Sequence, residues 1–381
     1  MDPIVIIGSG LAGYNVAREL RKLDKKTPLT LISADTGHFY SKPMLSSALG
    51  TGKTPHSIPM NSAEQMTAQL NGAVRTKTRI TSIDPAQHAI RVGDETINYS
   101  KLVLALGADQ IRLPIQGSAA ERILTVNDLD DYARFRAALT DKSTVALIGA
   151  GLIGSEFAND LTTGGHKVEV IDIAPHPLSR LLTPEGGALL QRKLAELGVV
   201  WHLGTSVSAL DTDGDKLRVT LANGHGFVAD IVLSAVGLKP RTALAVAAGI
   251  KVNRGIAVNR HLETSAADIY ALGDCAEVAG LVLPFVMPIM HAARALAATL
   301  AGKHTPVSYP AMPVLVKTPA CPTIVSPPPI GVDGKWTVTA DAEGVKSLFH
   351  DASGKLVGFA LNGKATAERA ALTQQLPPVL A

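Results

Sequence analysis

Residues 145–161 read VALIGAGLIGSEFANDL, an apolar run that meets a glycine-rich turn. The turn contains three glycines: Gly149, Gly151 and Gly154. This order predicts a strand, a tight turn and the start of a helix, whose backbone N–H groups can approach a pyrophosphate. Residues 4–20, IVIIGSGLAGYNVAREL, repeat the pattern with Gly8, Gly10 and Gly13. The chain therefore predicts two dinucleotide-binding units.

Composition and charge limit the classes of protein to consider. The 381 residues suffice for two or three domains. The net charge of +3, without a basic stripe interleaved with aromatic residues, argues against nucleic-acid binding. No apolar run reaches the roughly 18–20 residues of a membrane span. The N-terminus enters a strand directly, so we expect no membrane insertion and a cytoplasmic location.

The chain has two cysteines, Cys275 and Cys321, which lie far apart in the sequence. They match neither a disulfide framework nor a zinc-binding set, and neither has a second thiol close by for a dithiol relay. We therefore expect both to be buried, small apolar residues, and we expect no metal site.

Both glycine turns stand in the same longer context. Each is followed by a helical segment and a second apolar strand, TPLTLISAD at 27–35 and HKVEVIDIA at 166–174. Further apolar strands end near glycine: residues 101–108, 230–240 and 268–278. Residues 287–302 are rich in alanine and predict a helix. One unit used twice predicts an α/β fold built as an internal repeat at domain scale.

The last part of the chain, residues 313–381, changes character. Proline is dense in PVLVKTPACPTIVSPPP, which favours an irregular segment or an edge strand over a helix. The stretches KWTVTA and GKLVGFALNG are β-like, and a short helical segment follows them. The sequence therefore predicts a small α+β domain here.

Five stretches together resemble one known family, in the right order and over nearly the whole chain: VIIGSGLAGYNVA, LVLALGA, LIGAGLIGSEFA, AVGLKPRTAL and DIYALGDCAE. This is the family of flavoprotein reductases with two Rossmann-like dinucleotide-binding domains, of the glutathione-reductase fold. The resemblance implies FAD on the first glycine turn and NAD(P)H on the second, with electrons passing from nicotinamide to flavin N5. It also implies the domain limits: a split FAD domain at 1–112 and 241–312, an NAD domain at 113–240, and a C-terminal domain at 313–381.

A redox cysteine pair marks the dithiol members of that family, and this sequence has none. The resemblance therefore points to the branch that reduces small iron proteins. Three stretches are most similar to the bacterial rubredoxin–NAD(+) reductases: FYSKPMLS, NRGIAVNRHLETS and VKTPACPTIVSPPP. The flavorubredoxin reductases of nitric-oxide detoxification are the nearest competitor.

The resemblance assigns the FAD contacts residue by residue. The family usually has an acid at the end of the second strand for the ribose; here Ser33 stands there, with Asp35 two residues on. The ribose contact therefore stays open, and Asp35 is equally a candidate turn residue. Asp274 follows a strand and offers an acceptor to the ribityl hydroxyls, and Met287 offers backbone at a helix N-terminus near the flavin. The predicted FAD contacts are Gly8, Ser9, Gly10, Leu11, Ala12, Gly13, Ser33, Ala34, Asp35, Lys42, Ile80, Glu156, Asp274, Met287 and Lys317.

Each glycine turn, together with the start of the helix that follows it, forms a cradle for a dinucleotide. The second cradle is assigned to the nicotinamide nucleotide. Asp172 ends the strand KVEVID about 20 residues after the glycines, where it would accept from the ribose 2′-OH and repel a 2′-phosphate. We therefore expect NADH rather than NADPH. The predicted contacts are Gly149, Gly151, Leu152, Ile153, Gly154, Glu156, Asp172 and Gly237.

Three charged residues are predicted to act in electron transfer: Lys42, Glu156 and Lys317. Each lysine stands in an apolar or proline-rich context, and the resemblance places both beside the flavin. Taken without the family, each is a solvated surface lysine. Glu156 is expected in the first helical turn after the second glycine loop, where a carboxylate suits the helix dipole. The resemblance implies that this acid lies close to the nicotinamide and the flavin and pairs with Lys42.

The resemblance implies that bound FAD passes electrons from NADH to rubredoxin, a small acidic iron protein, one electron at a time. A flavorubredoxin or a ferredoxin stays open as the acceptor. An NADH oxidase, or a non-catalytic NADH-sensing flavoprotein, is a competing function. Both alkane hydroxylation and oxidative-stress defence fit as the pathway.

A basic cluster in RELRKLDKK is one candidate docking surface for the acidic partner. Its members fall at helical spacings that would share one face: Arg21, Lys22, Lys25 and Lys26. A solvated helix end is the competing interpretation. If the cluster has no such role, the C-terminal domain is the alternative docking surface.

Overall fold

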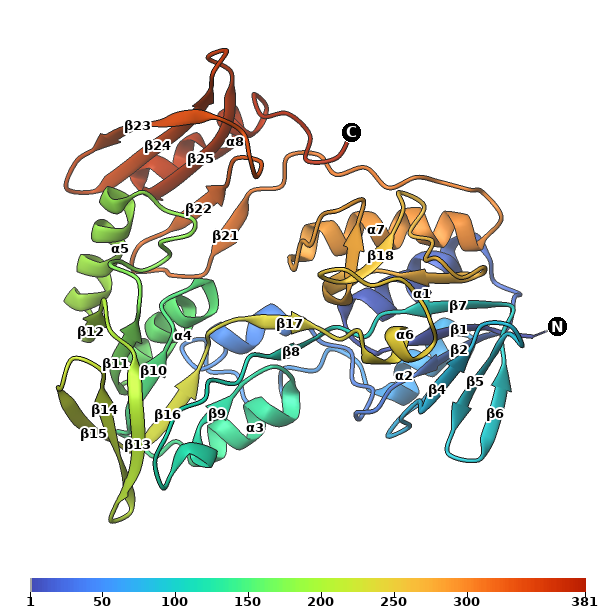
Figure 1. Ribbon diagram of the computed structural model, residues 1–381, viewed down its shortest axis with the longest axis horizontal. Coiled ribbons are helices and arrows are strands. Elements are labelled where there is room, and N and C mark those ends of the chain that lie inside the picture. The colour runs from blue at the N-terminus through green and yellow to red at the C-terminus, as the bar shows by residue number, and fades with distance from the viewer. Residues whose placement is uncertain (1) are drawn as a thin grey trace.

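The computed structural model describes residues 2–381 and contains two parallel five-stranded sheets, which lie in the right and left halves of Figure 1. The first sheet has the order β19-β7-β1-β2-β3. Its central strand, β1, has four apolar residues that are all buried, as expected for a parallel strand covered on both faces. The strands are β1 (Ile4–Ile7), β2 (Leu29–Ile32), β3 (Ala73–Arg75), β7 (Lys101–Leu104) and β19 (Ile269–Ala271).

The second sheet repeats this design with the order β12-β11-β10-β16-β9. Its central strand β10 pairs in parallel with β11 and β16, as β1 does with β2 and β7. The strands are β9 (Leu124–Thr125), β10 (Thr144–Ile148), β11 (Lys167–Asp172), β12 (Val199–Leu203) and β16 (Ile231–Ser234). The predicted α/β fold with two Rossmann-like sheets is confirmed.

Helices and small sheets complete the two halves. Helix α7 packs along α1 in the first half. The first half also contains α1 (Leu11–Leu23), α2 (Ala63–Leu70), β4 (Ser82–Asp84), β5 (Ala89–Val92), β6 (Glu95–Asn98), α6 (Ala243–Ala247), β18 (Ile256–Val258), η3 (Gly273–Cys275), β20 (Ala276–Val278) and α7 (Val286–Leu300). The chain of the first half also supplies η1 (Lys42–Ser47), whose Leu45 packs into the core of the second half. The second half contains η2 (Ala120–Arg122), α3 (Leu129–Ala138), α4 (Leu152–Thr163), α5 (Pro184–Glu196), β13 (Val207–Asp213), β14 (Lys216–Leu221) and β15 (Gly226–Ala229).

Two short antiparallel strands, β8 (Ala108–Gln110) and β17 (Leu238–Pro240), connect the halves (Figure 1). The chain leaves the first half through β8 and returns through β17. They lie beside the expected domain limits at residues 112 and 241, and we retain these limits as a proposal.

The C-terminal residues form an antiparallel sheet with the order β21-β22-β25-β24-β23. Its core is continuous with that of the second half, because Val316 and Val345 belong to the same buried cluster as Leu190 of α5. The proline-dense segment forms two strands, of which β21 is the expected edge strand and β22 lies inside the sheet. The elements are β21 (Val314–Val316), β22 (Thr323–Ser326), β23 (Gly334–Ala340), β24 (Gly344–Asp351), β25 (Leu356–Gly363), η4 (Lys364–Glu368) and α8 (Arg369–Thr373).

Helix α1 ends before the basic cluster does, so the shared helical face expected there is wrong. The helix stops at Leu23, and Asp24 accepts hydrogen bonds from the backbone N–H groups of Lys26 (2.8 Å) and Thr27 (3.1 Å). Lys25 and Lys26 therefore follow a turn. Arg21 donates to the backbone carbonyls of Asp24 (3.0 Å) and Thr27 (2.9 Å), which gives it a structural role.

Both cysteines, Cys275 and Cys321, are buried and unpaired, as the sequence predicts. Among residues 2–381, no helix has the length and apolar character needed to cross a membrane.

Candidate active site

The first glycine turn has the close backbone approaches that only glycine allows. Gly8 has a φ of +116°, and a Cβ there would lie 2.2 Å from the Ala105 carbonyl oxygen. A Cβ at Gly13 would lie 1.9 Å from the Gly8 carbonyl oxygen. A Cβ at Gly10 would meet no atom within 4 Å, because this residue faces open space. The turn is therefore compact where the chain meets itself and open where a ligand would approach.

The second turn has the same geometry. Gly149 has a φ of +108°, a Cβ at Gly154 would lie 1.8 Å from the Gly149 carbonyl oxygen, and Gly151 faces open space. Neither α1 nor α4 has a side-chain cap or an acid in its first turn. The first N–H groups of both helices therefore remain available to an anion, and both turns fit the pyrophosphate of a dinucleotide.

The serine at the end of β2 belongs to a hydroxyl cluster with the first turn. Ser33 Oγ lies 2.6 Å from Ser9 Oγ, which donates to Asp35 Oδ1 at 2.9 Å. The same Asp35 oxygen accepts from the Gly37 backbone N–H at 2.8 Å, so Asp35 does order a turn. Its Oδ2 accepts no hydrogen bond from the described residues and is exposed next to Ala34. Both proposed roles of Asp35 are therefore compatible with the geometry.

Asp172 ends β11 and holds the second glycine turn in place. Its Oδ2 accepts from the Ala150 backbone N–H at 2.5 Å, and its Oδ1 accepts from the Ala174 N–H at 2.8 Å. Each carboxylate oxygen retains a lone pair for a further donor. The acid thus lies beside the turn, at the edge where the ribose of a bound dinucleotide would lie.

The other predicted contacts occupy helix starts and loop ends. Ile80 is partly buried against the core of the first half. Gly237 has a φ of +120°, and its carbonyl accepts from the Ile111 N–H at 3.0 Å where β17 begins. The first two residues of each cradle helix are also predicted contacts: Leu11 and Ala12 in α1, Leu152 and Ile153 in α4. Their nucleotide contacts stay predictions.

The loop that carries Asp274 lies against the first turn of α1. Gly273 has a φ of +78°, and a Cβ there would lie 2.8 Å from the Ala12 Cβ. Lys42 is the first residue of η1. Burial lowers the pKa of the Lys42 ammonium, and the nearby Asp274 carboxylate opposes that decrease. The first cradle is therefore lined by an acid and a partly desolvated lysine.

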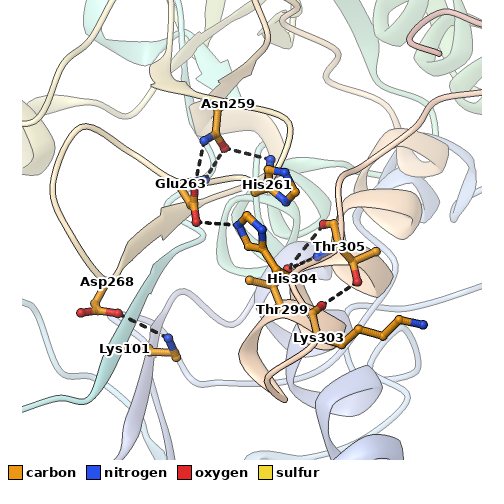
Figure 2. A network of polar contacts seen from close by, with 9 residues as sticks. All are labelled: Lys101, Asn259, His261, Glu263, Asp268, Thr299, Lys303, His304 and Thr305. Carbon is orange, nitrogen blue, oxygen red and sulfur yellow. Dashed lines mark hydrogen bonds and ion pairs between the residues drawn. The ribbon is translucent and has the colours of Figure 1, made fainter.

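Helix α7 begins at Val286, one residue earlier than expected, so Met287 lies within its first turn. No side chain caps this helix start and no acid stands in its first turn, which leaves its partial positive charge exposed. The opposite end is held by the polar network of Figure 2. There the Thr305 N–H donates to Thr299 Oγ1 at 3.0 Å, and His304 Nε2 lies 3.0 Å from Glu263 Oε1.

Glu156 is fully buried and joins three parts of the molecule. Its Oε2 lies 2.6 Å from Ser46 Oγ of η1, and its Oε1 accepts from the Lys317 backbone N–H at 2.9 Å. The Lys317 ammonium also pairs with Oε2. Two expectations are therefore corrected. Glu156 is the fifth residue of α4 and lies beyond its first turn, and its cationic partner is Lys317 rather than Lys42.

The reason for both corrections is the packing of α4. Beyond its first turn this helix faces η1 on one side and the segment after β21 on the other. The carboxylate therefore meets donors from these neighbours instead of the N–H groups of its own helix. Lys42 is the first residue of η1, and the negative charge that acts most on its pKa is that of Asp274.

Two residues that hold η1 against α4, Ser46 and Asp160, were not predicted from the sequence. Ser46 is a small polar residue in a mostly apolar stretch. Asp160 accepts from the backbone N–H groups of Leu49 (3.0 Å) and Gly50 (2.7 Å), and so ties the end of η1 to α4. Burial raises the pKa of the Asp160 carboxyl. A polar residue within an apolar helix face is the only sequence feature that could have marked it.

Two matching cradles in one chain, with a buried hydrogen bond between η1 and the helix of the second cradle, fit a protein that binds two dinucleotides. Residues 2–298 match the family model described as pyridine nucleotide-disulphide oxidoreductase, and residues 306–376 match the rubredoxin binding C-terminal domain. The chain belongs to the pyridine nucleotide-disulphide oxidoreductase family, and within it to the group of the rubredoxin–NAD(+) reductases. Family membership implies the use of a flavin together with NAD(H).

Two relatives and one solved structure are similar to this chain over 99–100% of its length. A rubredoxin-NAD(+) reductase of Alcanivorax borkumensis is 48% identical over 381 residues, with 100% of both chains covered. A rubredoxin-NAD(+) reductase of Acinetobacter baylyi is 49% identical, covering 100% of this chain and 99% of its own. The crystal structure of a ferredoxin reductase from Rhodopseudomonas palustris is 28% identical, with a TM-score of 0.88 over 99% of this chain and 96% of its own.

Proposed function

We propose that this protein transfers electrons from NADH to rubredoxin, with FAD held on the first glycine turn and NADH bound at the second. The observation that carries the proposal is the contact between η1, which begins with Lys42, and the helix of the second cradle. Glu156, in the helix that opens at the second cradle, meets Ser46 of the first half at 2.6 Å. A short, buried hydrogen bond therefore fixes the segment that begins with Lys42 against the helix of the second cradle, and electron transfer between two bound nucleotides requires such fixed positions.

Each predicted residue has a definite task in this proposal. The open N–H groups of α1 hold the pyrophosphate of FAD, and Asp274 accepts from its ribityl hydroxyls. The exposed N-terminus of α7 favours negative charge on the flavin ring, as do Lys42 and Lys317. Asp172 accepts from the adenosine ribose of NADH. Bound FAD supplies the change from a two-electron donor to a one-electron acceptor.

The partner docks on the C-terminal domain in this proposal. The rubredoxin-binding match at residues 306–376 supports that surface, and the basic cluster after α1 is withdrawn as the docking face. The rubredoxin reductase relatives, at 48% and 49% identity, place rubredoxin ahead of flavorubredoxin and ferredoxin as the acceptor. The cytoplasmic location stays a prediction, which cell fractionation would test.

The experiment uses the purified holoprotein. Flavin released by denaturation should be FAD, at one per chain. NADH should bleach the flavin in anaerobic stopped flow, and turnover should be fastest with purified rubredoxin among rubredoxin, flavorubredoxin and ferredoxin. A protein that is not reduced by NADH, or that reduces none of the three carriers faster than oxygen, would rule the proposal out.

A further inference from the structure

Ser46 is the least conspicuous member of the buried cluster around Glu156. It lies in the last turn of η1, is 2% exposed, and places its hydroxyl oxygen 2.6 Å from Glu156 Oε2. A fully buried carboxylate is costly unless several donors satisfy it. The other two donors to Glu156 belong to Lys317. Among the described residues, Ser46 is thus the single donor to this carboxylate from the first half of the molecule.

The direction of the Ser46 hydroxyl follows from its two neighbours. Its oxygen lies 3.3 Å from the Pro43 carbonyl oxygen and 2.6 Å from the Glu156 carboxylate. A hydroxyl has one hydrogen to donate, and the shorter contact with a charged acceptor is much the stronger. Ser46 therefore donates to Glu156, and it fixes the spacing between η1, which begins with Lys42, and α4.

We propose that Ser46 is a positioning residue for electron transfer from NADH to the flavin. Its hydroxyl holds the Glu156 carboxylate, and through it the Lys317 ammonium, in one arrangement between η1 and α4. The inference rests on the proposed function. Charged groups near reacting atoms must be held within about 0.5 Å of their working positions. Removal of the hydroxyl would release the carboxylate from η1 without altering either glycine turn.

The test compares Ser46→Ala with a matched control, Ser47→Ala, by anaerobic stopped flow. The Ser47 hydroxyl donates only within η1, to the Met44 carbonyl at 3.4 Å. We expect Ser46→Ala to slow flavin reduction at saturating NADH about three- to tenfold, the scale of one typical intramolecular hydrogen bond. The NADH concentration for half-saturation should change less than twofold. Ser47→Ala should match the wild type, and Ser46→Thr should restore most of the rate.

A double-mutant cycle separates positioning from a general loss of stability. Glu156→Gln removes the charge that Ser46 holds, so adding Ser46→Ala to Glu156→Gln should change the reduction rate less than twofold. Independent, multiplicative effects of the two substitutions would overturn the inference. So would a Ser46→Ala variant with wild-type reduction kinetics. If Ser46→Ala does not retain its flavin, Ser46→Gly is used in the same cycle.

Failure of the inference and failure of the proposed function give different results. If NADH does not reduce the flavin of the wild-type holoprotein, the proposed function fails, whatever Ser46 does. If the wild type is reduced and Ser46→Ala behaves like Ser47→Ala, only the inference about Ser46 fails.

Discussion

Removal of the Lys317 side chain tests the ion pair that joins the C-terminal segment to α4. In Lys317→Ala the Glu156 carboxylate stays fully buried but loses its one cationic partner. Loss of one member of a buried pair costs about 3–5 kcal/mol. Glu156 would keep the Ser46 hydroxyl and the backbone N–H of residue 317 as donors, and the Lys317 side chain is 27% exposed. We therefore expect the lower end, about 3 kcal/mol less free energy of unfolding.

The second variant of this test is the pair Lys317→Ala with Glu156→Gln. A neutral amide needs no cation. The free energy of unfolding of the double variant should therefore be at least about 1 kcal/mol larger than that of Lys317→Ala alone. Urea unfolding of the holoproteins, followed by tryptophan fluorescence and circular dichroism, measures both differences. A Lys317→Ala variant within about 0.5 kcal/mol of the wild type, or a double variant no more stable than the single one, would refute the reasoning.

Four further predictions address the cradles, the charge balance and the docking surface. The wild type should prefer NADH over NADPH by at least ~10-fold in kcat/KM, and Asp172→Ala should narrow that gap, since one ribose contact accounts for ~1.4 kcal/mol. Asp274→Ala should retain less FAD after gel filtration than the wild type, because an acceptor for the ribityl hydroxyls is lost. Hydrogen bonds, first from the Thr27 hydroxyl and then from backbone N–H groups, lower the pKa of Asp24 to about 2 from 3.8. Its stabilising effect is therefore present above pH 3.8 and lost as pH falls through 2, and Asp24→Ala should flatten acid unfolding curves in that interval. Charge reversal by Lys25→Glu should leave rubredoxin reduction and its salt dependence unchanged, and a slower reaction would return the docking surface to the end of α1.

The sequence by itself determined the two cradles. Three glycines between an apolar strand and a helix specify a turn whose geometry depends on residues within about a dozen positions. The close approach of Gly13 to the Gly8 carbonyl is such a local feature. The burial of Cys275 and Cys321 was likewise predictable from composition.

Only the tertiary structure decided which charged groups meet. Ser46 and Glu156 are 110 residues apart, and Glu156 and Lys317 are 161 apart. No periodicity or spacing encodes such contacts, so the sequence paired Glu156 with the wrong lysine. The end of α1 was missed for a related reason. The helix ends at Leu23, and the Asp24 side chain accepts a hydrogen bond from the Lys26 backbone N–H in the turn that follows. The spacing of the basic residues in the sequence stays helical beyond Leu23, although the backbone does not.

The difference between the two kinds of feature has one physical cause. A glycine turn is stabilised by backbone conformations and contacts within a single segment, so its residues must stand at fixed spacings. The cluster of Ser46, Glu156 and Lys317 is stabilised by the desolvation of a carboxylate that three separate segments enclose. Its members need only the right side chains and a fold that brings them together. The sequence therefore determined the two glycine turns and the helices that follow them, and the tertiary structure determined which charged groups meet beside α4.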